Sequence, residues 1–159
     1  GKLIGACIKE GRIVPAEITM RLIINAMDAS DAGVFLIDGC PRDQDNLTTL
    51  EDMILDSGEA RLAGVLFYDC PEEEMLNRIL KRGETSGRTD DNVESAKKRF
   101  ETFTQQTMPI VEQYRLKDLV YDIDATRTVD EVFDESRKVM NVLLKGTKRR
   151  ASFRRSARR

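Results

Sequence analysis

The sequence predicts an α/β protein with a doubly wound parallel sheet, and three observations lead to this fold class. Short apolar runs bounded by turn residues occur at 34–38, 62–68 and 120–123, the pattern of strands that are buried on both faces. Segments with apolar residues at spacings of three and four lie between these runs, and such spacing predicts helices. Strands that alternate with helices favour a parallel sheet with helices on both faces.

The first 32 residues predict two helices. Apolar residues at helical spacing indicate one over 2–10, and Gly11 ends it. Pro15 is placed at the first turn of the second helix, where a missing N–H costs nothing. The apolar stripe of that helix consists of Ile18, Leu22, Ile23 and Ala26. This stripe indicates packing against a core.

The middle of the chain follows the strand at 34–38 with further elements. Leu47, Leu50 and Ile54 mark a helix that ends near Gly58. The strand at 62–68 comes next. Pro71 then opens a helix with three glutamates in its first turn, where the helix dipole favours acids.

The last third starts with residues 83–91, which hold two glycines and no apolar residue and predict a mobile loop. Asp91 and the residues after it resemble a cap for a long helix, which Pro109 is expected to kink. After the strand at 120–123, Thr128 and Glu131 form a capping box for the last helix.

The composition limits which kinds of catalytic and metal-binding site the chain can form. The chain has 159 residues, of which 34% are charged and 40% apolar, a balance typical of one soluble globular domain. There is no histidine, which excludes Ser-His, Cys-His and histidine-metal sites. The three cysteines lie far apart and predict reduced thiols in the cytoplasm rather than disulfides or zinc ligands. No apolar run is long enough for a membrane helix.

The net charge of −2 hides an asymmetry. Residues 145–159 contain eight basic residues and no acidic one, which leaves 18 basic against 28 acidic residues in the rest of the chain. An acidic body does not favour nucleic-acid binding. We expect the tail at 145–159 to be disordered because it is polar and basic, with nuclear localisation through it as an alternative to the cytoplasm.

The stretch after the first strand carries the most informative side chains. Asp38 and Arg42 flank a glycine and a proline at the end of the strand at 34–38, and strand ends of this kind are where open α/β sheets bind ligands. Arginine suits phosphate because its guanidinium is permanently charged and grips two oxygens. A carboxylate there suits the magnesium ion of a nucleotide. The simpler interpretation is an ordinary proline turn with a solvated arginine.

Two separated motifs decide between these interpretations. Residues 38–42 read Asp-Gly-Cys-Pro-Arg, and residues 86–92 read Ser-Gly-Arg-Thr-Asp-Asp-Asn. Together they resemble the nucleoside-monophosphate kinase family, and within it the UMP–CMP kinases. The resemblance runs from Gly1 to about Leu144. It implies a P-loop-kinase-type sheet, acceptor-binding helices at 1–32, a core at 33–144 with a short lid at 83–92, and a monomer.

The resemblance also implies the site residues. Arg42, Arg88 and Arg99 would be catalytic and would hold the acceptor phosphate and the transferred group. Arg82 and Arg127 would contact ATP, and Asp38 would hold Mg²⁺ through water. The acceptor pocket would consist of Arg12, Ile13, Val14, Gly39, Cys40, Pro41 and Asn46 together with the three catalytic arginines. Cys40 replaces the aromatic residue of the family motif, which leaves substrate choice more open.

Asn46 has two interpretations, and so does the pair Asp90 and Asp91. Asn46 lies where UMP–CMP kinases carry an asparagine that reads the base, while a cap for its helix is the alternative. Asp90 and Asp91 would grip Arg88 or other lid groups when the lid closes over ATP, while Asp91 is also the expected helix cap.

The 159 residues contain no G-x-x-x-x-G-K-[ST] motif. The P-loop and the central first strand that the resemblance implies are therefore absent from this chain, and we expect it to be inactive alone. Three functions stay open: ATP-dependent phosphorylation of CMP and UMP with Mg²⁺, phosphorylation of AMP, and non-catalytic nucleotide binding. Separately, Arg149-Arg150-Ala151-Ser152 resembles a site at which a basophilic protein kinase would modify Ser152. An unmodified solubilising tail is the alternative.

Overall fold

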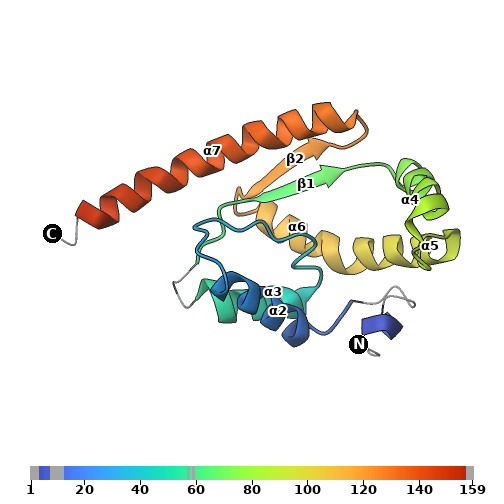
Figure 1. Cartoon of the computed structure of the whole chain (residues 1–159), viewed down its shortest axis with the longest axis horizontal. Coiled ribbons are helices and arrows are strands. Elements are labelled where there is room, and N and C mark those ends of the chain that lie inside the picture. The colour runs from blue at the N-terminus through green and yellow to red at the C-terminus, as the bar shows by residue number, and fades with distance from the viewer. Residues whose placement is uncertain (1–3, 8–12, 57, 59, 157–159) are drawn as a thin grey trace. The chain divides into compact units, whose positions relative to one another are not determined.

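The computed structural model describes residues 4–7, 13–56, 58 and 60–156, and for residues 146–156 it describes the backbone alone. The chain divides into two compact units, Gly1–Arg61 with Glu72–Gln113 and Leu62–Pro71 with Tyr114–Arg159. Each unit is considered by itself below (Figure 1). No described helix has the length and apolar character needed to cross a bilayer.

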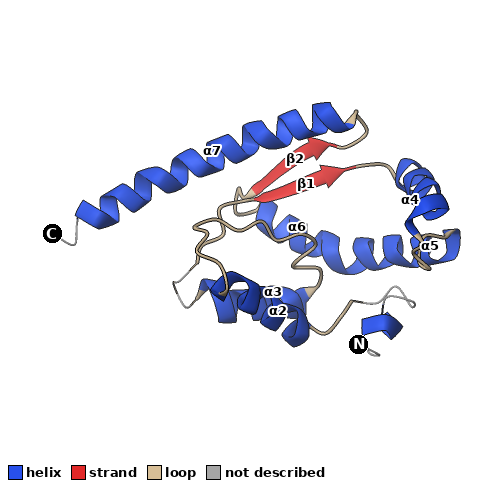
Figure 2. Cartoon of the chain, in the orientation of Figure 1, coloured by secondary structure: helices blue, strands red, loops and turns tan. Residues whose placement is uncertain are grey.

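The first unit is helical (Figure 2). Residues 4–7 are helical, while the rest of the helix predicted over 2–10 lies outside the described residues. The remaining elements are α2 (Ala16–Asp28), α3 (Gln44–Leu50), the π-helix η1 (Glu51–Leu55), α4 (Glu72–Ser86), α5 (Val93–Thr102), the π-helix η2 (Phe103–Thr107) and the start of α6 (Met108–Arg115).

A small core holds α2 against α3 and η1. Met20, Leu50 and Ile54 are buried and touch one another, and Cys40 and Ile23 pack at their edge. Met20 is not part of the predicted stripe, and Leu22 of that stripe is 61% exposed, so of its members only Ile23 packs against this core. Burial of apolar side chains of this size contributes about 1.5–3 kcal/mol each. This contact therefore fixes the position of α3, which carries Asn46.

Two helix boundaries follow from prolines. Pro15 is the N-cap of α2 rather than its first residue, one position from the prediction. Pro109 lies at the second position of α6, directly after η2. Since proline removes a donor from the helix ladder, a wider π-turn before it accommodates the lost bond. The predicted irregularity at Pro109 is confirmed.

The predicted strand at 34–38 is wrong. Residues 34–37 are not in a strand and Asp38 lies in a turn. Leu36 is 76% exposed, and the side chains of Val34, Phe35 and Ile37 are exposed as well. A strand needs a neighbour for its N–H and C=O groups. In the described part of the chain the sheet consists of β1 and β2, which pair with each other and not with this segment.

The second unit contains that sheet. β1 (Val65–Asp69) and β2 (Val120–Asp124) pair in parallel, with Val65 opposite Val120 and Asp69 opposite Asp124. The two later predicted strands and their parallel arrangement are thus confirmed. Ile123 is completely buried.

α7 (Val129–Ser156) packs along this sheet (Figure 1). Its start is the predicted capping box: Glu131 accepts from the Thr128 N–H at 3.0 Å and hydroxyl at 2.6 Å. On β1, the Tyr68 hydroxyl is 3.0 Å from that of Ser136. The described backbone of α7 runs to Ser156, and the disorder expected of the tail at 145–159 stays a prediction. Lysine, arginine and alanine are good helix formers.

Candidate functional site

The turn at 38–42 is shaped by Gly39 and Arg42. Gly39 has a φ of 67°, a conformation that favours glycine. The Arg42 Nε donates to the Gly39 carbonyl at 2.6 Å, and a Cβ at Gly39 would collide with that guanidinium. The Arg42 carbonyl accepts from the Thr107 hydroxyl at 2.7 Å. The turn thus holds the guanidinium of Arg42 over its own backbone, beside the exposed Asp38.

Asn46 is buried and fully engaged with its neighbours. It is 2% exposed. Its backbone N–H and its Nδ2 both donate to the Asp43 carboxylate, at 2.7 and 2.6 Å, and the Cys40 Sγ lies 4.0 Å from its Oδ1. The cap of α3 is Asp43, so the alternative that Asn46 caps its helix is wrong. In this structure the Asn46 amide is held by Asp43, with Cys40 beside its oxygen.

The short loop after α4 is tied to the helix by one carboxylate. Asp91 accepts from Arg82 through both oxygens, at 2.9 and 2.6 Å, and from the Ser86 hydroxyl at 2.8 Å. These bonds, with that of Arg82 first, lower the pKa of Asp91 to about 2. Gly83 permits the approach, because a Cβ there would lie 2.7 Å from the Asp91 carbonyl oxygen.

A second carboxylate joins two of the predicted catalytic arginines. Asp90 accepts from Arg88 through both oxygens, at 3.0 and 2.9 Å, and from the Arg99 Nη1 at 3.4 Å. Asp90 is 6% exposed. The hydrogen bond with Arg88 is the largest cause that lowers the pKa of Asp90 and raises that of Arg88. Arg88 Nε is also 3.9 Å from Asp91.

These five residues form what we call the lid cluster: Arg82, Arg88, Asp90, Asp91 and Arg99. Three guanidinium groups and two carboxylates leave one positive charge. Arginine forks of this kind bind phosphate oxygens in the same way that they bind carboxylates here. Asp90 and Asp91 thus bind Arg88 and Arg82 in this structure, while the prediction that they do so when the lid closes over ATP stays a prediction.

Two details of this region differ from the prediction. The helix cap is Asn92, which accepts from the Ser95 N–H at 2.9 Å, and not Asp91. Asp91 cannot cap because Arg82 and Ser86 occupy its oxygens. The loop predicted over 83–91 is also shorter, since α4 reaches Ser86.

The remaining predicted residues lie elsewhere. Arg42 makes its described hydrogen bonds with Gly39 and Thr107 and not with the lid cluster. Ile13 and Val14 are half-buried ahead of α2, and Arg12 lies outside the described residues. Arg127 belongs to the second unit, where it pairs with Glu135 at 2.7 Å and Asp124 at 3.3 Å.

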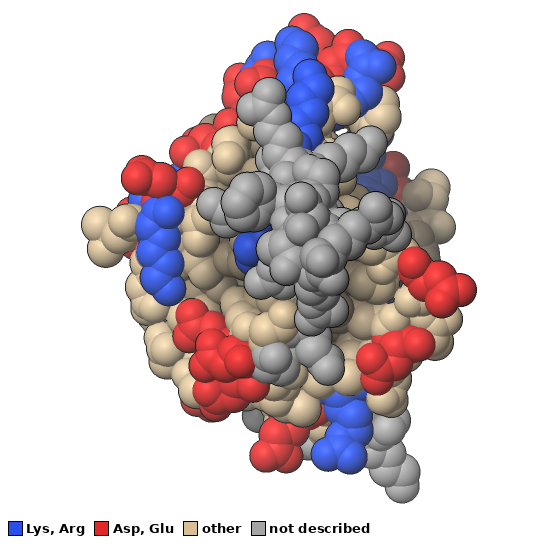
Figure 3. All heavy atoms as spheres, turned by 90° about the vertical axis from the view of Figure 1, so that its left-hand side faces the viewer, with Lys and Arg blue, Asp and Glu red and all other residues tan. Residues whose placement is uncertain are grey.

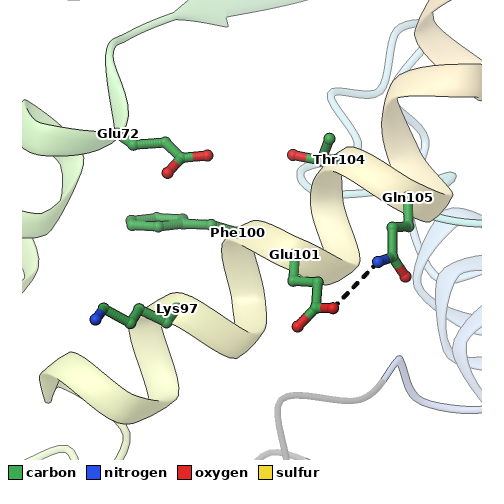
Figure 4. Close-up of a pocket in the computed structure, with 6 residues that line it drawn as sticks. All are labelled: Glu72, Lys97, Phe100, Glu101, Thr104 and Gln105. Atoms are coloured by element: carbon green, nitrogen blue, oxygen red, sulfur yellow. Dashed lines mark hydrogen bonds between the residues drawn. The ribbon is translucent and has the colours of Figure 1, made fainter.

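Two of the hollows among the described residues lie in the first unit. One of about 290 Å³ lies where α4 begins beside α5, with the Phe100 ring between charged and polar side chains (Figure 4). None of the predicted site residues lines it. Another of about 380 Å³ is lined by Asp43, the partner of Asn46, with residues of η2 and α6.

A magnesium ion fits this chain only in a limited way. Among the described residues there is no group of three or more side chains that could hold a metal. Mg²⁺ in phosphoryl-transfer enzymes is usually held by one or two carboxylates, substrate phosphates and water. Asp38 fits that role, and the ion would supply neutralisation of phosphate charge.

Comparison with known proteins identifies the family to which this chain belongs. The family model described as adenylate kinase matches residues 1–119. The chain belongs to the adenylate kinase family. A UMP-CMP kinase of Lentinula edodes is 45% identical over 92% of this chain and 68% of its own length. The human UMP-CMP kinase is 48% identical over 85% of this chain and 70% of its own length. The uridylate kinase of Saccharomyces cerevisiae is 46% identical over 85% of this chain and 65% of its own length.

Family membership confirms the α/β fold class and the resemblance seen in the two motifs. Sequence reasoning missed Asp43, which both caps α3 and holds the Asn46 amide. An aspartate directly before a helix is a common cap, so this signal was present. The contact between Cys40 and Asn46 had no comparable signal, because it depends on how the turn folds.

Proposed function

We propose that the protein to which this chain belongs transfers the γ-phosphoryl group of ATP, with Mg²⁺, to CMP and UMP. The observation that carries this proposal is the sharing of Asp90 by Arg88 and Arg99. It brings two permanent positive charges together on one carboxylate in the loop after α4. Phosphoryl transfer needs such charge because negative oxygens crowd together in the transition state.

Within this proposal the residue roles are those that the family resemblance implies. Arg42, Arg88 and Arg99 would hold the acceptor phosphate and the group in transfer. Arg82 and Arg127 would contact ATP. In the resting structure Asp90 and Asp91 hold three of these arginines, so an incoming phosphate would exchange with a carboxylate, and the loop would close as it does so.

The acceptor preference rests on Asn46. Curated relatives of this chain are named UMP-CMP kinase and uridylate kinase. Asn46 lies in α3, the helix that follows the turn at 38–42. A carboxamide offers both a donor and an acceptor to a base edge. Because Asn46 is 2% exposed, contact with a base requires the residues around it to move. Residues 1–32 would line the same pocket, and the lid would span 83–92.

The direct test is phosphoryl transfer by the full-length protein. ADP release from ATP and Mg²⁺ should depend on CMP or UMP, with the Arg88→Ala variant as the control for contaminating kinases. AMP as the best acceptor would replace this proposal with an adenylate kinase function. No transfer to any of the three nucleotides would favour a non-catalytic binding protein.

A further inference from the structure

Cys40, Asp43 and Asn46 form a connected set, of which the proposed roles use Asn46 alone. They follow one another at intervals of three residues across the turn and the first turn of α3. The Asp43 Oδ1 accepts from both nitrogens of Asn46, and the Cys40 Sγ lies 4.0 Å from the Asn46 Oδ1. Each polar end of the Asn46 amide thus has a neighbour.

The Asp43 carboxylate decides which way round the amide lies. An ionised carboxylate accepts hydrogen bonds and does not donate them. The atom of Asn46 that lies 2.6 Å from the Asp43 Oδ1 must therefore be the nitrogen. The amide oxygen consequently points to Cys40.

The Cys40 thiol is held in place and stays protonated. It packs against the core of Met20, Leu50 and Ile54. Burial raises the pKa of Cys40 to about 11, against an opposing effect of Arg42. A protonated thiol is a weak hydrogen-bond donor, and the Asn46 oxygen is its acceptor.

We propose that Cys40 is a positioning residue, whose S–H group holds the Asn46 carboxamide in one orientation and thereby sets the preference between CMP and UMP. This rests on the proposed function. Cytosine presents an amino donor where uracil presents a carbonyl acceptor. An amide that rotates freely suits both bases, while a fixed amide presents its donor and acceptor in one order and favours one of them. Asn46 is buried, so its carboxamide already has this orientation before an acceptor nucleotide binds.

The test uses the full-length protein with Cys40→Ala, which removes the donor, and Cys40→Ser, which keeps one. Steady-state kinetics with CMP and with UMP at saturating ATP give KM and kcat for each. Loss of a weak hydrogen bond of about 0.5–1 kcal/mol corresponds to a two- to fivefold change. Cys40→Ala should raise the acceptor KM by that factor and shift the CMP-to-UMP ratio of kcat/KM. The KM for ATP should stay unchanged, and Cys40→Ser should restore the wild-type ratio.

A double-mutant cycle separates positioning from packing. If Cys40 acts through Asn46, then Cys40→Ala has no further effect in an Asn46→Ala background. Equal effects in both backgrounds, or a Cys40→Ser variant as impaired as Cys40→Ala, would overturn the inference in favour of a packing role. An active wild-type enzyme that is indifferent to Cys40→Ala overturns this inference alone. A wild-type protein without transfer to CMP or UMP overturns the proposed function, and this inference with it.

Discussion

The Asp91 carboxylate accepts two hydrogen bonds from the Arg82 guanidinium, one from Nε at 2.9 Å and one from Nη2 at 2.6 Å. This pair fastens the end of the lid loop, just before α5, to the last turns of α4. Its oxygens are enclosed by the chain, whereas Arg82 is about half exposed. The loop is therefore anchored at Asp91 to α4, and at Asp90 to Arg99 of α5.

The anchor should respond to acid. The pKa of Asp91 is lowered to about 2 in the folded chain, below its ordinary value. A group of this kind stabilises the fold above its unfolded pKa of about 3.9, and that stability is lost as the pH falls through about 2. Asp91→Asn should therefore lower the free energy of unfolding at pH 5 to 6, and the difference from wild type should shrink between pH 4 and pH 2. Urea denaturation at stepped pH measures this.

Glu94→Gln is the matched control for that experiment. Glu94 pairs with Lys98 on the surface of α5, and exposed pairs of this kind contribute little. A stability difference for Asp91→Asn that does not change with pH would contradict the assigned role of the carboxylate.

The arginines of the site should matter for rate and not for folding. Arg88→Ala and Arg42→Ala should each lower kcat by about 100- to 1000-fold, the cost of one preorganised donor to the transition state. Arg78→Ala serves as control, because Arg78 lies on α4 and pairs with Glu74 one turn away. Melting temperature is measured beside kcat. Parallel losses of melting temperature and rate would make these arginines structural.

Gly39 offers a test of the turn. Gly39→Ala places a methyl group at a backbone conformation with φ of 67° and against the Arg42 guanidinium. Left-handed strain costs about 1–2 kcal/mol, and the displaced arginine should lower kcat as Arg42→Ala does. Gly33→Ala is the control, since nothing lies within 4 Å of a Cβ there. Wild-type kcat in Gly39→Ala would show that this arrangement of Arg42 is not needed.

The 159-residue span expressed by itself should show no kinase activity. It has no G-x-x-x-x-G-K-[ST] motif, so it lacks the backbone donors and the lysine that cradle the β- and γ-phosphates in kinases of this type. The exposed apolar side chains at 34–37 should also make the isolated span prone to aggregate. ADP release with ATP and CMP, checked against a mock purification, measures the first effect. Clear turnover would contradict it.

Motifs and helix signals predicted much of this molecule. The capping box at Thr128 and the irregularity before Pro109 were readable from local patterns, because each depends on neighbours in the chain. The strands around Val65 and Val120 were readable as apolar runs, and they pair with each other across the sequence. The two motifs at 38–42 and 86–92 led to the family, which the comparisons confirm.

Local patterns could not predict which partner a strand or a side chain finds in the folded chain. Phe35 and its neighbours are as apolar as β1, but a strand also needs an adjacent strand, and no residue pattern within 34–38 reveals whether one is available. Asp91 and Asn92 are equally good caps by composition. Asn92 caps α5 because Arg82 and Ser86 bind the Asp91 carboxylate.

The central claim is that a pyrimidine-nucleotide acceptor is chosen through Asn46. The measurement that tests it most directly is the ratio of kcat/KM for CMP to that for AMP, determined with the full-length protein and its Asn46→Gln variant. A longer side chain displaces the amide from Asp43 and leaves buried polar groups unpaired. The account predicts a wild-type ratio well above one and a fall of about tenfold or more in Asn46→Gln, with the KM for ATP unchanged. A wild-type ratio below one, or an equal ratio in both proteins, would contradict it.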